Sequence, residues 1–259
     1  MNTFRIILIF FLLSAYTAEA ETLFVYNPEA RVGRTEKIKS DLEEYLQSKG
    51  HHSEIYIYAN YDDFQNSVDR LKPDSAIVAS FCYSAMKEVY KWKLILSGYN
   101  SGAKSFNKVL VTPLSVSDPL QLKTKSVATV NLGLSSAMYI ESQLPPGLSV
   151  KDIRIATVSK DMDAIMALGF GQVEAAIVTR ASFDTLKKFF PDSAGKIHIL
   201  QELKPVEFPK VVVFPPFTAT KKLTEIFQQM SDKTVSKEVL KFFDITEFKP
   251  ESAEVDNEK

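Results

Sequence analysis

Strand-like and helix-like segments alternate along this chain, and their order constrains the fold more than any other feature of the sequence. Five such segments open it: TLFVY, a helix with Ile38, Leu42, Tyr45 and Leu46 on one face, EIYIYA, the helix YDDFQNSVDRL and SAIVAS. This order predicts a βαβαβ unit, in which right-handed crossovers place both helices on a parallel sheet. We therefore expect an α/β fold.

The same order recurs further along the chain, in SVATV, a helix from Ser135, IRIATV, a helix from about Asp161, and AAIV. A second βαβαβ unit predicts a second lobe. Since KVVVF and KKLTEIFQQM follow this complete unit, we expect the chain to return there to the first lobe. The predicted architecture is two lobes, each a mainly parallel sheet flanked by helices.

Two segments are expected to cross between the lobes and to act as a hinge, one near residues 112–117 and one near residues 203–209. Prolines stiffen both of them. The predicted boundaries are residues 21–112 and 209–248 for lobe 1, residues 113–208 for lobe 2, and residues 249–259 for a disordered acidic tail.

The first twenty residues have the composition of an export signal. Arg5 precedes the apolar run 6–13, and the small residues Ala18 and Ala20 follow it. The run is shorter than the roughly 20 apolar residues that a membrane-spanning helix needs. We expect residues 1–20 to be a signal peptide cut after Ala20, which would leave a periplasmic protein with no membrane insertion.

Charge and cysteine content argue against other classes of protein. A formal net charge of −1 gives no electrostatic reason to bind nucleic acid or an anionic membrane. The one cysteine, Cys82, allows no internal disulfide. A lone cysteine is more often a small buried hydrophobe than a reactive thiol, and the sequence leaves its role open.

Several stretches resemble one known family in the same order along the chain. They are DSAIVASFCYSAM, GYNSGAKSFNKVLVTPLS, SDPLQLKTKSVATV, DAIMALGFGQVEAAIVTR and EFPKVVVFPPFTATKKLTEIFQQM with VLKFFDITEFKP. Over about residues 22–250 they resemble the phosphate, phosphite and phosphonate-binding group of periplasmic substrate-binding proteins of ABC transporters. The chain departs from that pattern at Thr124, where the family usually has Gly, and at Thr179-Arg180. It keeps only part of the serine-rich anion turn, in NLGLSSAM.

Candidate site residues follow the strands, because open parallel sheets bind ligands beyond the C-terminal ends of their strands. These positions hold Tyr26, Asn27, Ser80, Phe81 and Tyr83 in lobe 1, and Asn131, Ser135, Ser136, Thr179 and Arg180 in lobe 2.

Each kind of candidate has a functional and a structural interpretation. Ser135 and Ser136 open a helix, whose N-terminus favours an anion, but either can simply be the N-cap. Arg180 can give a bidentate contact to a phosphate or carboxylate, or it can be a solvated residue at a strand end. The aromatic residues of lobe 1 can enclose a ligand or cover the core beneath them.

Catalytic and metal motifs are missing from the sequence. His51, His52 and His198 form no spaced metal set, and no G-x-S-x-G, H-E-x-x-H or G-x-x-x-x-G-K-[ST] occurs. GFGQVE lies between a helix and a strand, which reverses the dinucleotide-binding order. We expect no enzyme activity, no cofactor and no metal.

The resemblance implies a monomeric periplasmic solute-binding protein that closes on a small anion of the phosphate or phosphonate type. It implies delivery of that ligand to the membrane permease of an ABC transporter. The alternative is a sensory module of the same fold that signals ligand binding to a membrane histidine kinase.

Overall fold

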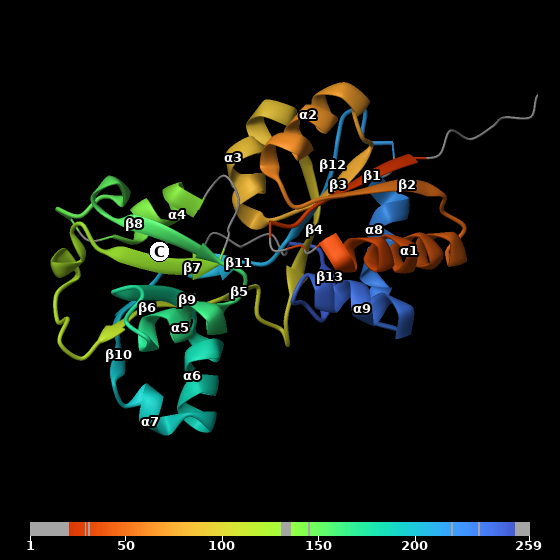
Figure 1. Ribbon diagram of the computed structural model, residues 1–259. Coiled ribbons are helices and arrows are strands. Elements are labelled where there is room, and N and C mark those ends of the chain that lie inside the picture. Colours follow the sequence, from red (N-terminus) through yellow and green to blue (C-terminus); the bar gives the residue numbers. More distant parts are fainter. Residues whose placement is uncertain are drawn as a thin grey trace, which may run out of the picture.

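The computed structural model describes residues 21–28, 30, 32–130, 136–144, 146–218, 220–232 and 234–251. They form two α/β lobes, each built on its own sheet, with a two-stranded sheet between them (Figure 1). The predicted signal peptide and residues 252–259 of the predicted tail lie outside the described residues.

Six strands of the described chain make the sheet of lobe 1, in the order β13-β4-β12-β3-β1-β2. Their bounds are β1 (Glu21–Tyr26), β2 (Ser53–Tyr58), β3 (Ser75–Val78), β4 (Lys93–Tyr99), β12 (Lys210–Val213) and β13 (Glu247–Lys249). β1 runs parallel to β2 and β3, as expected of a βαβαβ unit. β12 is antiparallel to both of its neighbours, because the chain re-enters lobe 1 from the side of lobe 2.

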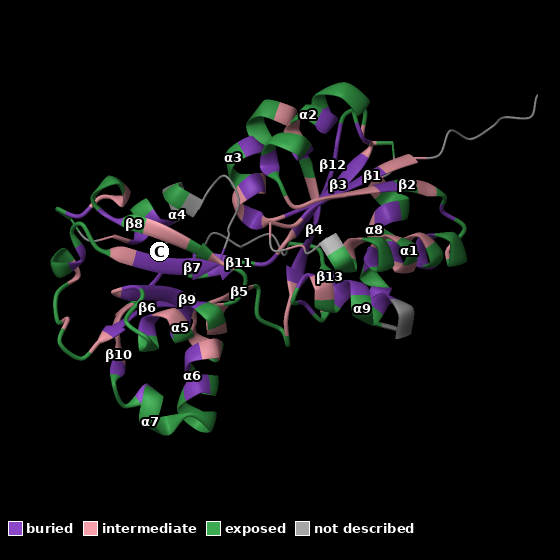
Figure 2. Cartoon of the chain, viewed as in Figure 1, coloured by how far each residue is buried: buried purple, intermediate pink, exposed green. Residues whose placement is uncertain are grey.

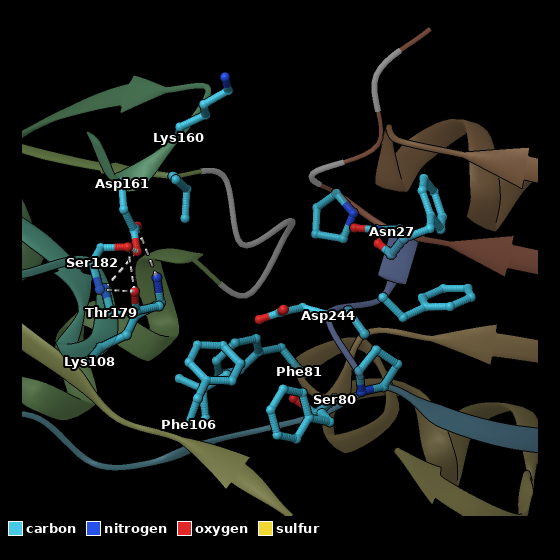
Figure 3. A pocket seen from close by; sticks show the side chains of 18 of the residues that line it. Asn27, Ser80, Phe81, Phe106, Lys108, Lys160, Asp161, Thr179, Ser182 and Asp244 are labelled. Atoms are coloured by element: carbon cyan, nitrogen blue, oxygen red, sulfur yellow. Dashed lines mark hydrogen bonds and ion pairs between the residues drawn. The ribbon is translucent and has the colours of Figure 1, made fainter. Parts of the chain in front are cut away.

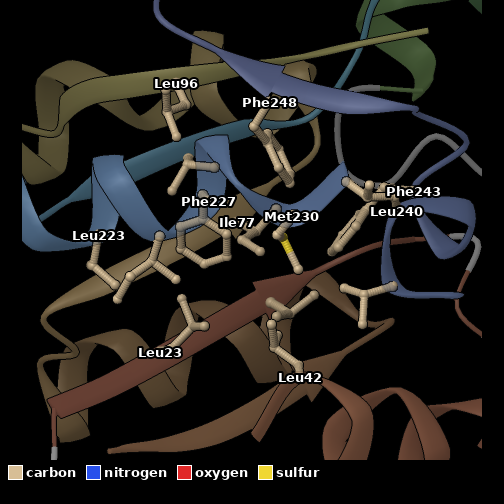
Figure 4. Packing of buried hydrophobic residues seen from close by; sticks show 14 of the residues in the cluster. Leu23, Leu42, Ile77, Leu96, Leu223, Phe227, Met230, Leu240, Phe243 and Phe248 are labelled. Carbon is tan, nitrogen blue, oxygen red and sulfur yellow. The ribbon is translucent and has the colours of Figure 1, made fainter. Parts of the chain in front are cut away.

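Helices cover both faces of this sheet, and each face has its own apolar core. The helices are α1 (Val32–Ser48), α2 (Tyr61–Leu71), α3 (Ser80–Tyr90), α8 (Thr220–Gln228), the 3-10 turn η4 (Met230–Asp232) and α9 (Thr234–Phe242). α1, α8 and α9 pack on one face around Leu42, Phe227 and Leu240 (Figure 4). α2 and α3 pack on the other face, around Phe64 and Met86.

Local sequence accounts for where the helices of lobe 1 lie. The face of α1 that carries Ile38, Leu42, Tyr45 and Leu46 is buried, as the spacing predicts. The N-cap of α2 is Asn60, whose side chain accepts hydrogen bonds from the backbone N–H groups of Asp62 and Asp63.

Lobe 2 is built on a five-stranded sheet within the described chain, in the order β10-β6-β9-β7-β8. Its strands are β6 (Lys108–Pro113), β7 (Ser126–Val130), β8 (Arg154–Val158), β9 (Ala175–Thr179) and β10 (Ile197–Glu202). Its helices are η1 (Pro119–Leu122), α4 (Ser136–Gln143), η3 (Val150–Asp152), α5 (Asp161–Gly169), α6 (Arg180–Phe189) and α7 (Pro191–Ala194). β7 is parallel to β8 and β9, whereas β6 is antiparallel to β9 and β10.

The sheet of lobe 2 is also covered on both faces. α5, α6 and α7 pack on one face, and α4 contributes the buried Ile140 to the other. Buried residues follow the central strands of each lobe, and exposed residues follow the outer sides of the helices (Figure 2).

The hinge lies between the lobes, where β5 (Ser105–Phe106) pairs antiparallel with β11 (Val206–Glu207). The Phe106 side chain packs against a core cluster of each lobe. The first crossing therefore comes earlier than the predicted 112–117. Residues 108–112 belong to β6 of lobe 2, because KVLVTP is a complete strand that ends at Pro113.

Two smaller departures concern the tail and residue 124. Lys249, predicted to begin the tail, belongs to β13 of the lobe 1 sheet and pairs there with Ser97 of β4. Thr124, where the family usually has Gly, holds a left-handed backbone with φ 65°. Its N–H donates to the carbonyl oxygen of Asp152 at 2.6 Å, which keeps the turn closed before β7.

Candidate functional site

A cavity of about 600 Å³ opens between the two lobes (Figure 3). Residues of lobe 1 that line it include Asn27, Arg34, Ser80, Phe81, Lys241, Phe242 and Asp244. Lobe 2 contributes Lys108, Val130, Ser159, Lys160, Asp161, Met162, Thr179 and Ser182, and the hinge contributes Phe106, Val206 and Glu207. The site is thus shared by both lobes, at the ends of strands from each sheet.

Four predicted site residues lie at this cavity: Asn27, Ser80, Phe81 and Thr179. The Asn27 side chain donates a 3.1 Å hydrogen bond to the carbonyl oxygen of Phe242. Ser80 begins α3, and its hydroxyl donates a 2.7 Å hydrogen bond to the carbonyl oxygen of Glu207 in β11. Phe81, although on a helix of lobe 1, packs against a core cluster of lobe 2.

Two predicted aromatic residues lie away from the cavity. Tyr26 is buried in lobe 1, with its ring stacked on Phe64 at a centroid distance of 5.2 Å. Tyr83 stacks on Trp92 at 6.5 Å, on the side of α3 that covers the same core. Both were predicted from their position after a strand, but their side chains point to the sheet rather than to the lobe interface.

Arg180 also lies away from the cavity. It is the first residue of α6, and its guanidinium forms ion pairs with Asp184 at 3.5 Å and with Glu202 of β10. Two carboxylates of lobe 2 therefore neutralise the charge that was predicted to hold an anion.

The remaining predicted residues belong to the start of α4. Asn131 and Ser135 lie outside the described residues, and Ser136 is described only as the first residue of α4. Their contact with a ligand stays a prediction.

Asp161 and the start of α6 form a hydrogen-bonded network in lobe 2. Thr179 is the N-cap of α6, and its backbone N–H donates to Asp161 Oδ2 at 2.7 Å. The Ser182 hydroxyl donates to the same oxygen at 3.1 Å, and the Thr179 hydroxyl bonds Ser182 Oγ at 2.8 Å. These contacts fix the orientation of the Asp161 carboxylate at the cavity wall.

Lys108, the first residue of β6, is the buried cation of the cavity wall. Its side chain is only 1% exposed, and its Nζ lies 3.7 Å from Asp161 Oδ1. The ammonium also lies over the Phe106 ring at 5.8 Å. A buried ammonium loses hydration that charge-assisted hydrogen bonds must replace, so this position favours an anionic oxygen.

Acidic groups face the network from lobe 1 and the hinge. Asp244 lines the cavity opposite Asp161 (Figure 3), and Glu207 lines it from β11. Burial raises the pKa of Asp244 above its ordinary value, and the charge of Asp161 raises it further. The lobes therefore present carboxylates to each other, and the positive charge of Lys108 between them relieves that repulsion.

In the described part of the chain, two helices begin at the cavity without a side-chain cap. They are α3, after Ala79, and α5, after Lys160. The N-terminus of a helix carries partial positive charge and N–H groups without intrahelical partners, so both favour a negative ligand group.

Lys108, Asp161 and Ser182 are site residues that sequence reasoning missed. In FNKVLVTP, Lys108 has the appearance of a solvated residue at the start of an apolar strand. For Asp161, the sequence predicts only the start of a helix. The available signal was the strand KVLVTP itself, because a lysine that begins an apolar strand buried from residue 108 to residue 112 has little open surface to reach.

Neither a metal cluster nor a membrane span is found in the described part of the chain. No group of three or more His, Cys, Asp or Glu residues there could hold a metal ion. No helix there is both long and apolar enough to cross a membrane.

Comparison by sequence identifies the family. Residues 24–255 match the family model for the ABC transporter, phosphonate, periplasmic substrate-binding protein. The chain belongs to this family. Members of this family bind substrates for ABC transporters, which agrees with a cavity between two lobes. No curated protein matches the chain by sequence.

Solved structures show the same two-lobed fold. XAC2383 from Xanthomonas citri, bound to ATP, has a TM-score of 0.65 and 14% identity, over 90% of this chain and 91% of that chain. A binding protein component of an ABC phosphonate transporter from Pseudomonas aeruginosa has a TM-score of 0.65 and 13% identity, over 90% of this chain and 82% of that chain. PhnD1 from Prochlorococcus marinus, in complex with methylphosphonate, has a TM-score of 0.65 and 12% identity, over 90% of this chain and 93% of that chain. At these identities the likeness concerns the fold.

Proposed function

We propose that this family member captures a small phosphonate-type anion between its lobes and delivers it to the membrane permease of an ABC transporter. The single observation that carries the proposal is the buried ammonium of Lys108 at the wall of a cavity shared by both lobes. The family match supports the ligand class, and so does the methylphosphonate held by PhnD1.

Several groups would act on the anion together. Lys108 supplies charge-assisted hydrogen bonds from lobe 2, and the N-terminus of α3 supplies partial positive charge from lobe 1. Phe81 and Phe106 line the cavity and would exclude water. A micromolar dissociation constant corresponds to about −8 kcal/mol, which a few ionic hydrogen bonds and aromatic burial can supply.

Ligand binding would favour a closed arrangement of the lobes. An anion held by Lys108 of lobe 2 and by the start of α3 in lobe 1 contacts both sides of the hinge. Such contacts stabilise the closed population, and the β5–β11 pair is where the motion would occur. Small-angle scattering should then give a smaller radius of gyration with saturating methylphosphonate than without it.

Titration calorimetry of the purified mature protein tests the ligand class. Methylphosphonate and inorganic phosphate are the probes, and the expected result is saturable one-site binding of at least one of them. If neither binds at millimolar concentration, the proposal fails.

Export is a separate part of the proposal. We propose cleavage after Ala20, which would leave Glu21 at the start of β1 as the first residue of a periplasmic protein. Intact-mass measurement of protein released by osmotic shock checks this. A mass that retains residues 1–20 would contradict it.

A further inference from the structure

The Lys108 and Asp161 side chains lie together at the cavity, but they are too far apart to satisfy each other. Their Nζ and Oδ1 atoms are separated by 3.7 Å, whereas an N–H···O hydrogen bond is about 2.7–3.2 Å long. The Lys108 side chain is 1% exposed and that of Asp161 11% exposed, so bulk water does little for either charge.

Within the described part of the chain, the rest of the network leaves the two facing atoms without hydrogen-bond partners. Asp161 Oδ2 accepts from the Thr179 N–H and from the Ser182 hydroxyl. Oδ1 is buried and has no hydrogen-bond partner among the described residues. The contacts of the Lys108 ammonium within the described chain are the ion pair with Asp161 and the Phe106 ring. Among the described residues, Asp161 Oδ1 therefore lacks a hydrogen-bond donor, and the Lys108 ammonium lacks an acceptor at hydrogen-bond distance.

One ligand oxygen can supply both missing partners. An oxygen about 2.8 Å from each atom fits across a gap of 3.7 Å. To do so it must accept a hydrogen bond from the ammonium and donate one to the carboxylate. A hydroxyl on phosphorus does both, whereas an ionised oxygen can only accept.

We propose that the Lys108–Asp161 pair is the specificity determinant of the cleft, selecting oxyanions that carry a proton over oxyanions that are fully ionised. This inference rests on the proposed function and names the form of the anion that is bound. The Lys108 ammonium pairs with the negative charge of the ligand, and Asp161 Oδ1 accepts a hydrogen bond from its P–OH group.

The chemistry of the two anion classes gives the selectivity. The second pKa of a phosphate monoester is about 6. A carbon in place of the ester oxygen raises it, so an alkylphosphonate at neutral pH has a substantial P–OH population. A sulfonate of the same shape has no such proton. Its oxygen beside Asp161 Oδ1 would place two acceptors in contact and leave the buried carboxylate oxygen without a donor.

Methylphosphonate and methanesulfonate form the matched probe pair. Titration calorimetry of the wild-type protein at neutral pH should show methylphosphonate binding about 10- to 100-fold more tightly, the effect of one buried polar group left without its partner. Equal affinities for the two probes would overturn the inference and leave the proposed function standing. If methylphosphonate, methanesulfonate and inorganic phosphate all fail to bind, both the inference and the proposed function are overturned.

Asp161→Asn assigns the selectivity to its residue. The amide can donate to an ionised oxygen, so the preference for methylphosphonate over methanesulfonate should fall at least about tenfold. Asp163→Asn removes the same charge from an exposed position in the same helical turn, and it should keep the wild-type preference. An unchanged preference in a folded Asp161→Asn variant would overturn the role of Asp161. If that variant does not fold, the ratio of the wild-type affinities for methylphosphonate and methanesulfonate still tests the inference.

Discussion

The hydroxyl of Ser80 donates a 2.7 Å hydrogen bond to the carbonyl oxygen of Glu207. This bond joins the first residue of α3, in lobe 1, to β11 of the hinge. Ser80 and Glu207 also both line the cavity, so the same contact connects the ligand site with the segment around which the lobes would move.

Ser80→Ala should therefore weaken the protein locally. Loss of this partly buried hydrogen bond should lower the free energy of unfolding by about 1 kcal/mol. Denaturant unfolding measures this change, with Ser84→Ala as a control on an exposed position of the same helix, where about 0.5 kcal/mol or less is expected. Equal effects of the two substitutions would argue against the hinge contact.

Thr124→Gly should stabilise the protein by about 1 kcal/mol, because the strain of a β-branched residue at positive φ outweighs the extra backbone entropy of glycine in the unfolded state. Thr124 has φ 65°. Thr124→Ala removes the branch but keeps Cβ, so it should stabilise less. Thermal and denaturant unfolding test both variants, and a less stable Thr124→Gly protein would contradict the argument.

Arg180→Ala should leave the affinity for methylphosphonate within about a factor of two. The guanidinium is engaged by Asp184 and Glu202 and lies outside the cavity wall. Because these groups are about half exposed, their loss should cost at most about 1 kcal/mol of stability. Calorimetry and a melting curve measure the two effects. A loss of affinity of tenfold or more would restore the predicted anion contact.

The comparison of Arg180 with Lys108 shows what the sequence could and could not predict. Apolar runs and helix faces predicted the elements and the two-lobed fold, since these depend on local patterns. The ends of strands directed attention to Asn27, Ser80 and Thr179, which line the cavity. Which cation faces the cavity depends on neighbours distant in sequence. Glu202 engages Arg180, whereas Lys108 is enclosed between lobe 2 and the hinge.

Side-chain direction also explains why Tyr26 and Tyr83 lie away from the cavity. Tyr26 ends β1 and Tyr83 lies in the first turn of α3, but each side chain packs on the same aromatic core of lobe 1. The position of the first crossing between the lobes also depends on pairing between residues distant in sequence. Whether residues 108–112 join lobe 1 or lobe 2 is decided by β9 and β10, their partners in the sheet.

Cys82 should be inert in the folded protein. The residue is 4% exposed, and burial raises the pKa of its thiol to about 12. Since the thiolate is the nucleophile, a maleimide reagent at mildly alkaline pH should label the native protein very slowly and the protein in guanidinium rapidly. Rapid labelling of the native protein would show that the thiol is accessible.

Lys108→Met tests the central claim most directly, because methionine has nearly the shape of lysine but no charge. Calorimetry with methylphosphonate should show the dissociation constant rising by about 10- to 100-fold relative to wild type, the effect of ionic hydrogen bonds worth about 1.5–3 kcal/mol. Lys196→Met, at an exposed position of the same lobe, serves as the control and should bind as wild type does. A melting curve shows whether each variant is folded. Wild-type affinity in a folded Lys108→Met protein would contradict the account.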